Sequence, residues 1–247
     1  MLRLVLVFLW LALSPAVGDG VAIPGIPQIG QVSSAIQYPP VSGGCASIGS
    51  TFAIDGTPQA VNASATTATT PGFSTTYCNN LVIVGVLTNG SSITSVTDSQ
   101  SHLIFTKRAT NSGGANDVDI WTAPLSGAPL TNDTITANAA GGNYITIVVN
   151  SVTFYHTASP FDPNVLLPFT NTTGPCTFTT TNANDMLYGF AVQNTSVPDS
   201  GWSLLSNITS SSGFLFGEYK IVSTTQTAST AASLTGNIAC DAIQKGP

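Results

Sequence analysis

The stretches "FSTTYCNNLVIVGVLTNGSSITSV" (residues 73–96) and "FTTTNANDMLYGFAVQNTSVPDSGWSLL" (residues 178–205) decide the fold class of this chain. Each contains a short apolar run rich in Val, Leu, Ile, Phe or Tyr, bounded by Thr, Asn, Gly and Ser. Short apolar runs between turn residues are typical of buried β-strands, whereas an amphipathic helix would place its apolar residues at helical spacing. The two stretches therefore predict an all-β protein.

The rest of the chain repeats this pattern, and helical periodicity is almost absent from it. We expect an antiparallel β-sandwich of the immunoglobulin-like or jelly-roll type, with about eleven to twelve strands, in residues 45–247. The expected strands are residues 80–87, 93–97, 103–109, 118–124, 133–138, 144–155, 186–193, 201–208, 214–222, 227–234 and 237–243.

The two opening stretches also resemble each other. Each has a Thr-rich lead-in, an Asn-Asn or Asn-Asp pair, a buried strand and a polar turn with a glycosylation sequon. A single half would leave its apolar face exposed, so we predict one sandwich built from two similar halves, about residues 73–155 and 178–243. The alternative is that any two β segments with Thr-rich turns look alike.

Residues 1–18, "MLRLVLVFLWLALSPAVG", have the layout of a secretory signal peptide. One basic residue, Arg3, precedes an apolar run and then small residues. The alternative is a retained anchor, but the run from Leu4 to Leu13 is too short to span a bilayer comfortably. We therefore expect a secreted protein, extracellular or at the cell surface, without membrane insertion once the signal is removed.

Residues 19–44 form an extended segment that falls outside the internal repeat. Its Pro residues keep the chain extended, and Pro39-Pro40 with Gly43-Gly44 form a hinge. Residues 30–38 alternate as one strand does. Either this strand packs as an edge strand on its own domain, or it is a donor strand that fills a groove in a neighbouring copy. The residues of its candidate donor face are Gly30, Val32, Ser34, Ile36 and Tyr38.

Charge is sparse, with 6% charged residues and a formal net charge of −6. Removal of Arg3 with the signal would make the net charge one unit more negative. An acidic protein is disfavoured as a partner of nucleic acid or of anionic membranes. So few charges are also unusual for a freely dissolved surface, which is often covered instead by glycans or by other copies of the protein.

The chain has four cysteines and six N-x-S/T sequons. An even number of cysteines in a secreted chain predicts disulfides, and without C-x-x-C spacing a zinc site is disfavoured. Three pairings are open. Most sequons lie in turn segments that would tolerate glycans. The residues are Cys45, Cys78, Cys176 and Cys240 for the disulfides, and Asn62, Asn89, Asn132, Asn171, Asn194 and Asn207 for glycosylation.

The stretch "SVTDSQSHLIFTKR" (residues 95–108) contains the side-chain types of a hydrolytic triad. Asp98, Ser99, Ser101 and His102 lie within five positions. A triad needs groups that converge from separate elements beside an oxyanion hole, and neighbours on one tight turn point in different directions. No G-x-S-x-G elbow occurs, so we interpret the stretch as a turn between two paired strands. A chance meeting with His156, the other histidine, stays open.

Three further sets of residues have side chains that occur in metal-binding, catalytic or sugar-binding sites. Asp117 and Asp119 could bind calcium with Asp98 or Asp133, but the ligands fall short of the six or more oxygens that calcium prefers. Glycosidase chemistry needs a second carboxylate, and the sequence does not indicate one for Glu218, which is expected to be paired across a sheet. Trp121 and Trp202 are expected in the core rather than on a sugar-binding surface. The sequence therefore predicts no catalytic residue, no metal site and no cofactor.

The order "ITSVTDSQ" (93–100), "LIFTKRA" (103–109), "VDIWTAPLSGAPLTNDTITAN" (118–138) and "ITIVVNSVTFYHTASPFD" (145–162) resembles a family of secreted bacterial and archaeal β-sandwich domains. The same family pattern continues in residues 184–192, 201–206 and 216–222. Gln100, Ser101 and His102 depart from it, since glycine-asparagine is usual there. The resemblance implies a surface or adhesive protein without known chemistry. The whole layout is also similar to subunits of archaeal extracellular thread filaments, which implies homopolymers.

These observations favour a secreted, non-enzymatic subunit of an extracellular filament, joined to other copies of itself by its N-terminal strand. N-glycans would cover each subunit. A monomeric adhesive or carbohydrate-binding module is the first alternative. A secreted hydrolase with a site assembled from distant residues is the second.

Overall fold

A computed structural model describes residues 52–142, 144–193, 197–209, 214–231 and 233–247. These residues form sixteen β-strands and contain no helix, which confirms the all-β fold class. The predicted signal peptide, the candidate donor strand, Cys45 and Asn194 lie outside the described residues. The strands are β1 Ala53–Ile54, β2 Gln59–Ala63, β3 Thr67–Thr69, β4 Asn80–Thr88, β5 Ile93–Asp98, β6 Thr106–Asn111, β7 Asp117–Leu125, β8 Ile135–Ala139, β9 Ile145–Thr153, β10 Phe169–Asn171, β11 Cys176–Phe178, β12 Met186–Val192, β13 Ser203–Thr209, β14 Phe214–Ile221, β15 Ser229–Ala231 and β16 Ile238–Ile243.

The strands form four antiparallel sheets, two from each half of the domain. We call β1-β9-β4-β7-β6, with β2 also paired to β9, central sheet 1, and β3-β8-β5 outer sheet 1. Central sheet 2 is β10-β16-β12-β14-β13, and outer sheet 2 is β11-β15. In both central sheets the first long strand of the half lies between the last and the middle long strands. The two central sheets therefore have the same strand order.

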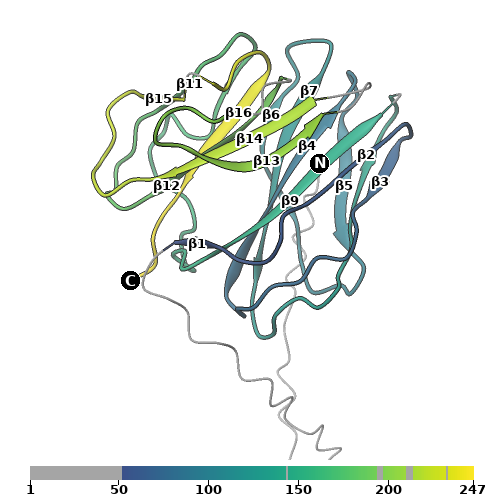
Figure 1. Cartoon of the computed structure of the whole chain (residues 1–247), viewed down its shortest axis with the longest axis horizontal. Coiled ribbons are helices and arrows are strands. Elements are labelled where there is room, and N and C mark those ends of the chain that lie inside the picture. Colours follow the sequence, from purple (N-terminus) through teal and green to yellow (C-terminus); the bar gives the residue numbers. More distant parts are fainter. Residues whose placement is uncertain (1–51, 143, 194–196, 210–213, 232) are drawn as a thin grey trace, which may run out of the picture. The chain divides into compact units, whose positions relative to one another are not determined.

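The sheets stack in layers, with one apolar core in each of the three spaces between them (Figure 1). The first core joins the two central sheets, and each of the other two joins a central sheet to its own outer sheet. Both faces of each central sheet are thus covered. This explains why β4 and β9 are buried along their whole length and read as continuous apolar runs instead of alternating ones.

All eleven expected strands are present, within a few residues of their expected ends. The five additional strands β1, β2, β3, β10 and β11 have two to five residues each. One expected pairing is wrong. Residues 93–97 and 103–109 were predicted to pair across the turn, but β5 pairs with β8 in outer sheet 1 and β6 pairs with β7 in central sheet 1. The connection between β5 and β6 crosses from one layer to the next.

A buried aspartate fixes the entry to the first long strand of each half. The carboxylate of Asp55 accepts hydrogen bonds from the backbone N–H of Thr76 and Tyr77 and from Nδ2 of Asn80, the last at 2.6 Å. A carboxylate that accepts several N–H donors can be buried without an ion-pair partner. Here it ties the start of β4 to the chain that precedes β2.

Asp162 repeats this arrangement in the second half. Its carboxylate accepts hydrogen bonds from the backbone N–H of Thr181 and Asn182, at 2.8–3.0 Å. By position Thr181 and Asn182 correspond to Thr76 and Tyr77, and Asp185 corresponds to Asn80. Shared strand order and a shared aspartate anchor both support the internal duplication.

The contact between the two central sheets centres on the ring of Phe190. A Cβ atom added to Gly85 on β4 would lie 2.8 Å from this ring, and one added to Gly217 on β14 would lie 2.7 Å from it. Real Cβ atoms do not approach a ring so closely, because van der Waals repulsion is steep at that distance. Gly85 therefore lets the two sheets approach across the Phe190 side chain, and Gly217 leaves room for the ring over the neighbouring strand of its own sheet.

We predict that Gly85→Ala lowers the free energy of unfolding by about 1–3 kcal/mol, the usual effect of overpacking a core. Alanine would otherwise be favoured over glycine in a strand, so the sign tests the contact with Phe190. Urea denaturation measures the change. Gly141→Ala is the matched control, since its added Cβ would lie 3.5 Å from Ser91 Oγ in ordinary contact. Equal stability of the two variants would contradict the argument.

Candidate functional site

The turn after β5 is held by the side chain of Asp98. Its Oδ2 accepts a hydrogen bond from the backbone N–H of His102 at 2.7 Å, and its Oδ1 accepts one from Leu103 at 3.3 Å. Ser101 takes a left-handed backbone conformation with φ of 59°. The interpretation of this stretch as turn chemistry is therefore confirmed, and Asp98 serves the backbone rather than the imidazole of His102.

Ser99 is hydrogen-bonded not to His102 but to a residue that lies far away in the sequence. Its Oγ donates to Oδ1 of Asp133 at 2.6 Å, and its backbone N–H donates to the same oxygen at 3.0 Å. Asp133 is fully buried, just before β8. In the described part of the chain no serine hydroxyl is hydrogen-bonded to the His102 ring, so the triad types in residues 98–102 do not form a nucleophile–base pair.

The turn and Asp133 nevertheless bring three potential ligands together. A carboxylate oxygen of Asp98, a ring nitrogen of His102 and a carboxylate oxygen of Asp133 lie within 4.8 Å of one another. The side chain of His102 is exposed and that of Asp98 is half-buried. His156 is not part of this group; its Nδ1 accepts a hydrogen bond from the Ser159 N–H at 3.0 Å.

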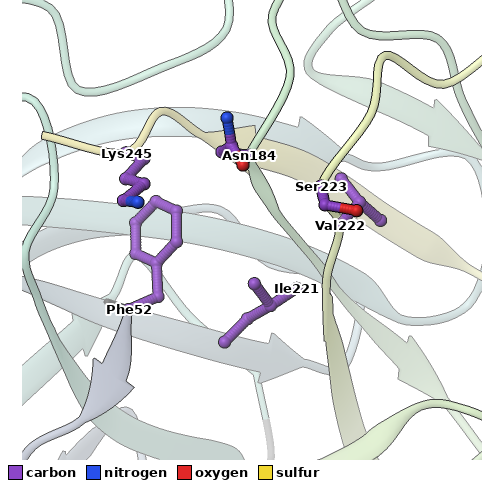
Figure 2. A pocket seen from close by; sticks show the side chains of 6 residues that line it. All are labelled: Phe52, Asn184, Ile221, Val222, Ser223 and Lys245. Carbon is purple, nitrogen blue, oxygen red and sulfur yellow. The ribbon is translucent and has the colours of Figure 1, made fainter. Parts of the chain in front are cut away.

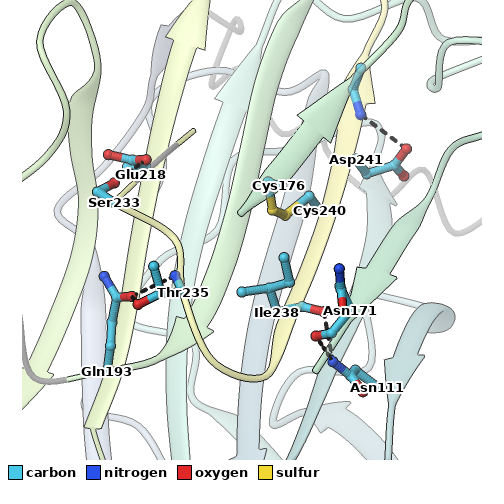
Figure 3. The surroundings of a disulfide bond; sticks show 11 residues. Asn111, Asn171, Cys176, Gln193, Glu218, Ser233, Thr235, Ile238, Cys240 and Asp241 are labelled. Atoms are coloured by element: carbon cyan, nitrogen blue, oxygen red, sulfur yellow. Dashed lines mark hydrogen bonds between the residues drawn. A yellow bond between two sulfur atoms is a disulfide. The ribbon is translucent and has the colours of Figure 1, made fainter. Parts of the chain in front are cut away.

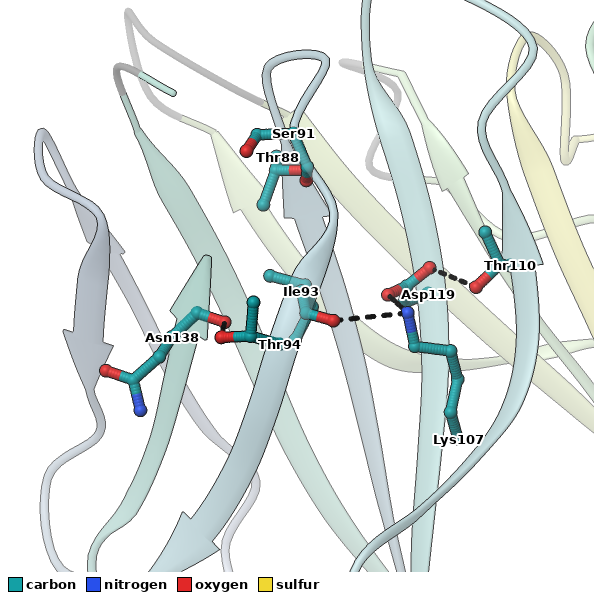
Figure 4. Close-up of polar contacts among 8 residues, drawn as sticks. All are labelled: Thr88, Ser91, Ile93, Thr94, Lys107, Thr110, Asp119 and Asn138. Carbon is teal, nitrogen blue, oxygen red and sulfur yellow. Dashed lines mark hydrogen bonds and ion pairs between the residues drawn. The ribbon is translucent and has the colours of Figure 1, made fainter. Parts of the chain in front are cut away.

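Asp117 and Asp119, the other acidic pair with the chemistry of a calcium site, both lie on β7, and Figure 4 shows the partners of Asp119. Nζ of Lys107 lies 2.8 Å from Oδ2 of Asp119, and Thr110 donates a hydrogen bond to Oδ1 at 2.7 Å. Burial, and then the charge of Asp119, raises the pKa of Asp117. The Lys107 amine supplies the countercharge here, so this pair forms an ion-paired cluster.

Glu218 is buried against a loop rather than paired with a cation (Figure 3). Its carboxylate accepts hydrogen bonds from the Ser233 hydroxyl and from the backbone N–H of Asp199. Burial raises its pKa, and the two hydrogen bonds partly offset that effect. The carboxylate therefore organises the loop before β13.

The disulfide between Cys176 and Cys240 lies nearby and joins β11 of outer sheet 2 to β16 of central sheet 2 (Figure 3). A Cβ atom on Gly189 would lie 2.6 Å from the sulfur of Cys240, so the glycine makes room for the bridge. Cys78 is disulfide-bonded as well. The Cys176–Cys240 disulfide therefore links outer sheet 2 to central sheet 2.

Asp162 and Asp185 form a carboxyl pair in the second half. Burial, then hydrogen bonding with Asp162 and its charge, raise the pKa of Asp185 to about 8. Burial also acts on Asp162, but the N–H donors of Thr181 and Asn182 outweigh it and lower its pKa. At neutral pH Asp185 is therefore protonated and takes the donor role that Asn80 has in the first half.

Asp241, another buried acid, joins the two halves of the domain. Nε of Arg108 on β6 donates to Oδ2 of Asp241 on β16 at 2.6 Å, and the Arg108 guanidinium lies 4.2 Å from the centre of the Phe161 ring. Burial raises the pKa of Asp241 to about 6, and Arg108 opposes that shift. This ion pair bridges the edge of central sheet 1 and the middle of central sheet 2.

The five sequons within the described residues differ in accessibility. Asn132 is exposed in a turn with φ of 51°, whereas the other four in the described residues are half-buried. Asn62 is used within a sheet, where its Oδ1 accepts a hydrogen bond from Thr146 at 2.8 Å. The half-buried sequons are Asn62, Asn89, Asn171 and Asn207.

A pocket of about 200 Å³ lies beside the end of β14 (Figure 2). Its lining is mostly apolar, with one amine and no carboxylate: Phe52, Asn184, Ile221, Val222, Ser223 and Lys245. Trp121 and Trp202 are less than a tenth exposed and pack in two of the cores, as expected. Neither the pocket nor the tryptophans supply an acid–base pair or an aromatic sugar platform.

Comparison with known protein families, curated proteins and solved structures finds no match for this chain. Within the described residues there is also no helix of the length and hydropathy that a membrane crossing requires. Among the clusters described above, the group of Asp98, His102 and Asp133 is the candidate functional site. The sequence alone does not indicate that Asp98, His102 and Asp133 meet, because Asp133 reaches the turn only through the pairing of β5 with β8.

The Asp162–Asp185 pair predicts a stability that falls as pH rises. The pKa of Asp185 is raised above its ordinary value of 3.8, so its contribution is complete below about pH 4 and is lost as pH rises toward about 8. Asp185→Asn supplies a permanent N–H donor to Asp162. We expect it to raise the free energy of unfolding by roughly 2–3 kcal/mol near pH 7 and by little near pH 4.

Urea titrations at about pH 4, 6 and 8 measure this difference. The matched control is Asn80→Asp in the first half, which creates the same carboxyl pair beside Asp55 and should introduce a new fall in stability with pH. Parallel pH profiles for the wild type and Asp185→Asn would contradict the assignment.

Proposed function

We propose that the protein is a secreted structural subunit of an extracellular filament, in which residues 30–38 of one copy add a strand to the next copy. The observation that carries the proposal is a difference between the two halves. Outer sheet 1 has three strands, β3-β8-β5, whereas outer sheet 2 has β11 and β15. Among the described residues no strand pairs with the second edge of β15.

The shorter connection in the second half accounts for this difference. Residues 89–105 join β4 to β6 and include β5, whereas only residues 193–202 join β12 to β13. Asp199 in this connection accepts a hydrogen bond from the backbone N–H of Ser233 at 2.8 Å. One backbone donor just after β15 is thus satisfied by a side chain. Thr230 on β15 is exposed, and Val197 in the connection is 72% exposed.

The edges of β5, β6 and β13 are less suitable for an added strand. Each of these strands has a bulge or register shift in its pairing, between Ile93 and Ser95, Lys107 and Ala109, and Leu204 and Ser206. Bulges on edge strands twist the edge and discourage pairing with another chain. The pairing of β15 with β11 has no such shift.

Residues 30–38 suit the site chemically. Val32, Ile36 and Tyr38 alternate with polar residues, so an added strand would present one apolar face to the core and one polar face to solvent. A subunit whose N-terminal strand enters the next subunit makes a head-to-tail contact that does not close, and such contacts build filaments.

We predict that Ile36→Asp in residues 19–247 abolishes assembly, because it places a charge on the donor face. Gln37→Asp is the matched control, since Gln37 lies on the opposite face of the same strand. Light scattering and electron microscopy measure assembly. On the acceptor side, Thr230→Asp on β15 should weaken assembly, because a charge on an edge strand discourages pairing, and Val165→Asp, at an exposed residue elsewhere, should not.

Equal fibre formation by Ile36→Asp and Gln37→Asp would show that the N-terminal strand is not the joint. The second candidate function is a monomeric adhesive module. It is favoured by the exposed loop residues Val165 and Leu166, which are 94% and 61% exposed. In that case the wild type stays monomeric, and Val165→Asp lowers its binding to a surface.

For glycosylation, the other part of this proposal, we predict Asn132 as the most fully occupied of the described sequons when the chain is made in a host that attaches N-glycans. Its side chain is exposed, whereas oligosaccharyl transfer at a half-buried asparagine competes with folding. Mass spectrometry of glycopeptides measures occupancy. Thr134→Ala removes the sequon and keeps Asn132 in its turn. Higher occupancy at Asn62 than at Asn132 would contradict the prediction.

A further inference from the structure

We propose that Asp98, His102 and Asp133 bind a divalent transition-metal ion of the zinc type at the edge of outer sheet 1. The three ligand atoms lie within 4.8 Å of one another, and they come from two segments that are distant in the sequence. The proposal is independent of filament formation, because these residues lie on outer sheet 1 and the candidate acceptor edge lies on outer sheet 2.

The buried state of Asp133 is the second observation that points to a cation. Asp133 has no exposed surface, and its Oδ2 has no hydrogen-bond partner. The ion pairs of the described residues join Lys107 to Asp119 and Arg108 to Asp241, so no lysine or arginine there neutralises Asp133. A buried carboxylate oxygen without a donor or a countercharge is costly, and a bound metal ion supplies both.

The surrounding hydrogen bonds orient the ligands, as outer partners of a metal site usually do. Ser99 donates twice to Oδ1 of Asp133, which leaves Oδ2 for a metal. The N–H groups of His102 and Leu103 fix the carboxylate of Asp98. Carboxylate oxygens retain further lone pairs after accepting these bonds, so both aspartates can still bind a cation.

The ring of His102 decides the class of metal. Imidazole suits zinc, copper and nickel, whereas calcium and magnesium take oxygen ligands. Metal–ligand distances of about 2.0–2.2 Å need a ligand set slightly tighter than the one observed. The side chain of His102 is exposed and therefore has room to rotate toward the two carboxylates. Two carboxylates and one imidazole leave the remaining coordination positions to water.

Such an ion would connect the turn after β5 to the residue that precedes β8. We therefore expect the bound ion to stabilise outer sheet 1. Binding to the folded chain alone raises the midpoint of thermal unfolding in proportion to the logarithm of the metal concentration.

The test titrates Zn²⁺ into metal-free protein of residues 19–247, followed by calorimetry and by thermal unfolding. We expect saturable binding of one ion, a rise in the unfolding temperature, and affinity at least about tenfold weaker in His102→Ala. Because His102 is exposed, this variant keeps the fold. His156→Ala is the matched control and should bind as the wild type does. Asp133→Asn should also weaken binding, and X-ray absorption should show nitrogen and oxygen ligands without sulfur.

Two outcomes would overturn the proposal. One is that neither Zn²⁺ nor Ni²⁺ binds the wild-type chain saturably. The other is a site elsewhere in the chain. Either tight binding by His102→Ala, equal to that of the wild type, or loss of the ion in His156→Ala would show this.

Discussion

The contact between the two central sheets is the constraint on which the rest of the structure depends. Phe190 lies over Gly85 of the facing sheet and over Gly217 of its own, and residues of both halves contribute to the core around it. Once this face of each central sheet is buried, its opposite face is still apolar and must be covered separately. The outer sheets provide that cover, which is why the domain has four layers rather than the two of a simple sandwich.

The two halves repeat one plan, so the places where they differ are the informative ones. Phe73 bridges to Asp133 in the first half, and Phe178 pairs with Ser229 at the corresponding place in the second. In the part of the chain that the structure describes, the group of three potential metal ligands therefore occurs once. Conversely, Asp185 occupies the position that corresponds to Asn80. The second half therefore contains a buried carboxyl pair, Asp162 and Asp185, that has no counterpart around Asp55. The strand β5 has no counterpart among the described residues of the second half.

Much of the fold follows from the sequence because the long strands are apolar runs between turn residues, and burial on both faces makes those runs continuous. The short strands β1 and β10 carry no such signal, since two or three residues cannot show alternation. The sequence also does not indicate which sheet each strand joins. Residues on either side of a tight turn usually pair, but here β5 and β6 enter different layers. The metal ligands were missed for the same reason, because only the pairing of β5 with β8 brings Asp133 to the turn.

The buried acids show how the division of the chain into halves bears on function. In the first half N–H donors meet Asp55 and a lysine meets Asp119, while burial raises the pKa of Asp117 and Oδ2 of Asp133 has no hydrogen-bond partner. In the second half burial raises the pKa of Asp185, Glu218 and Asp241, so the stability of this half falls as pH rises. Glu218 and Asp199 also hold the loop beside the open edge of β15. In the proposed filament an added strand at that edge would lie beside this loop, so the ionisation of the already buried Glu218 would affect assembly through the hydrogen bonds that hold the loop.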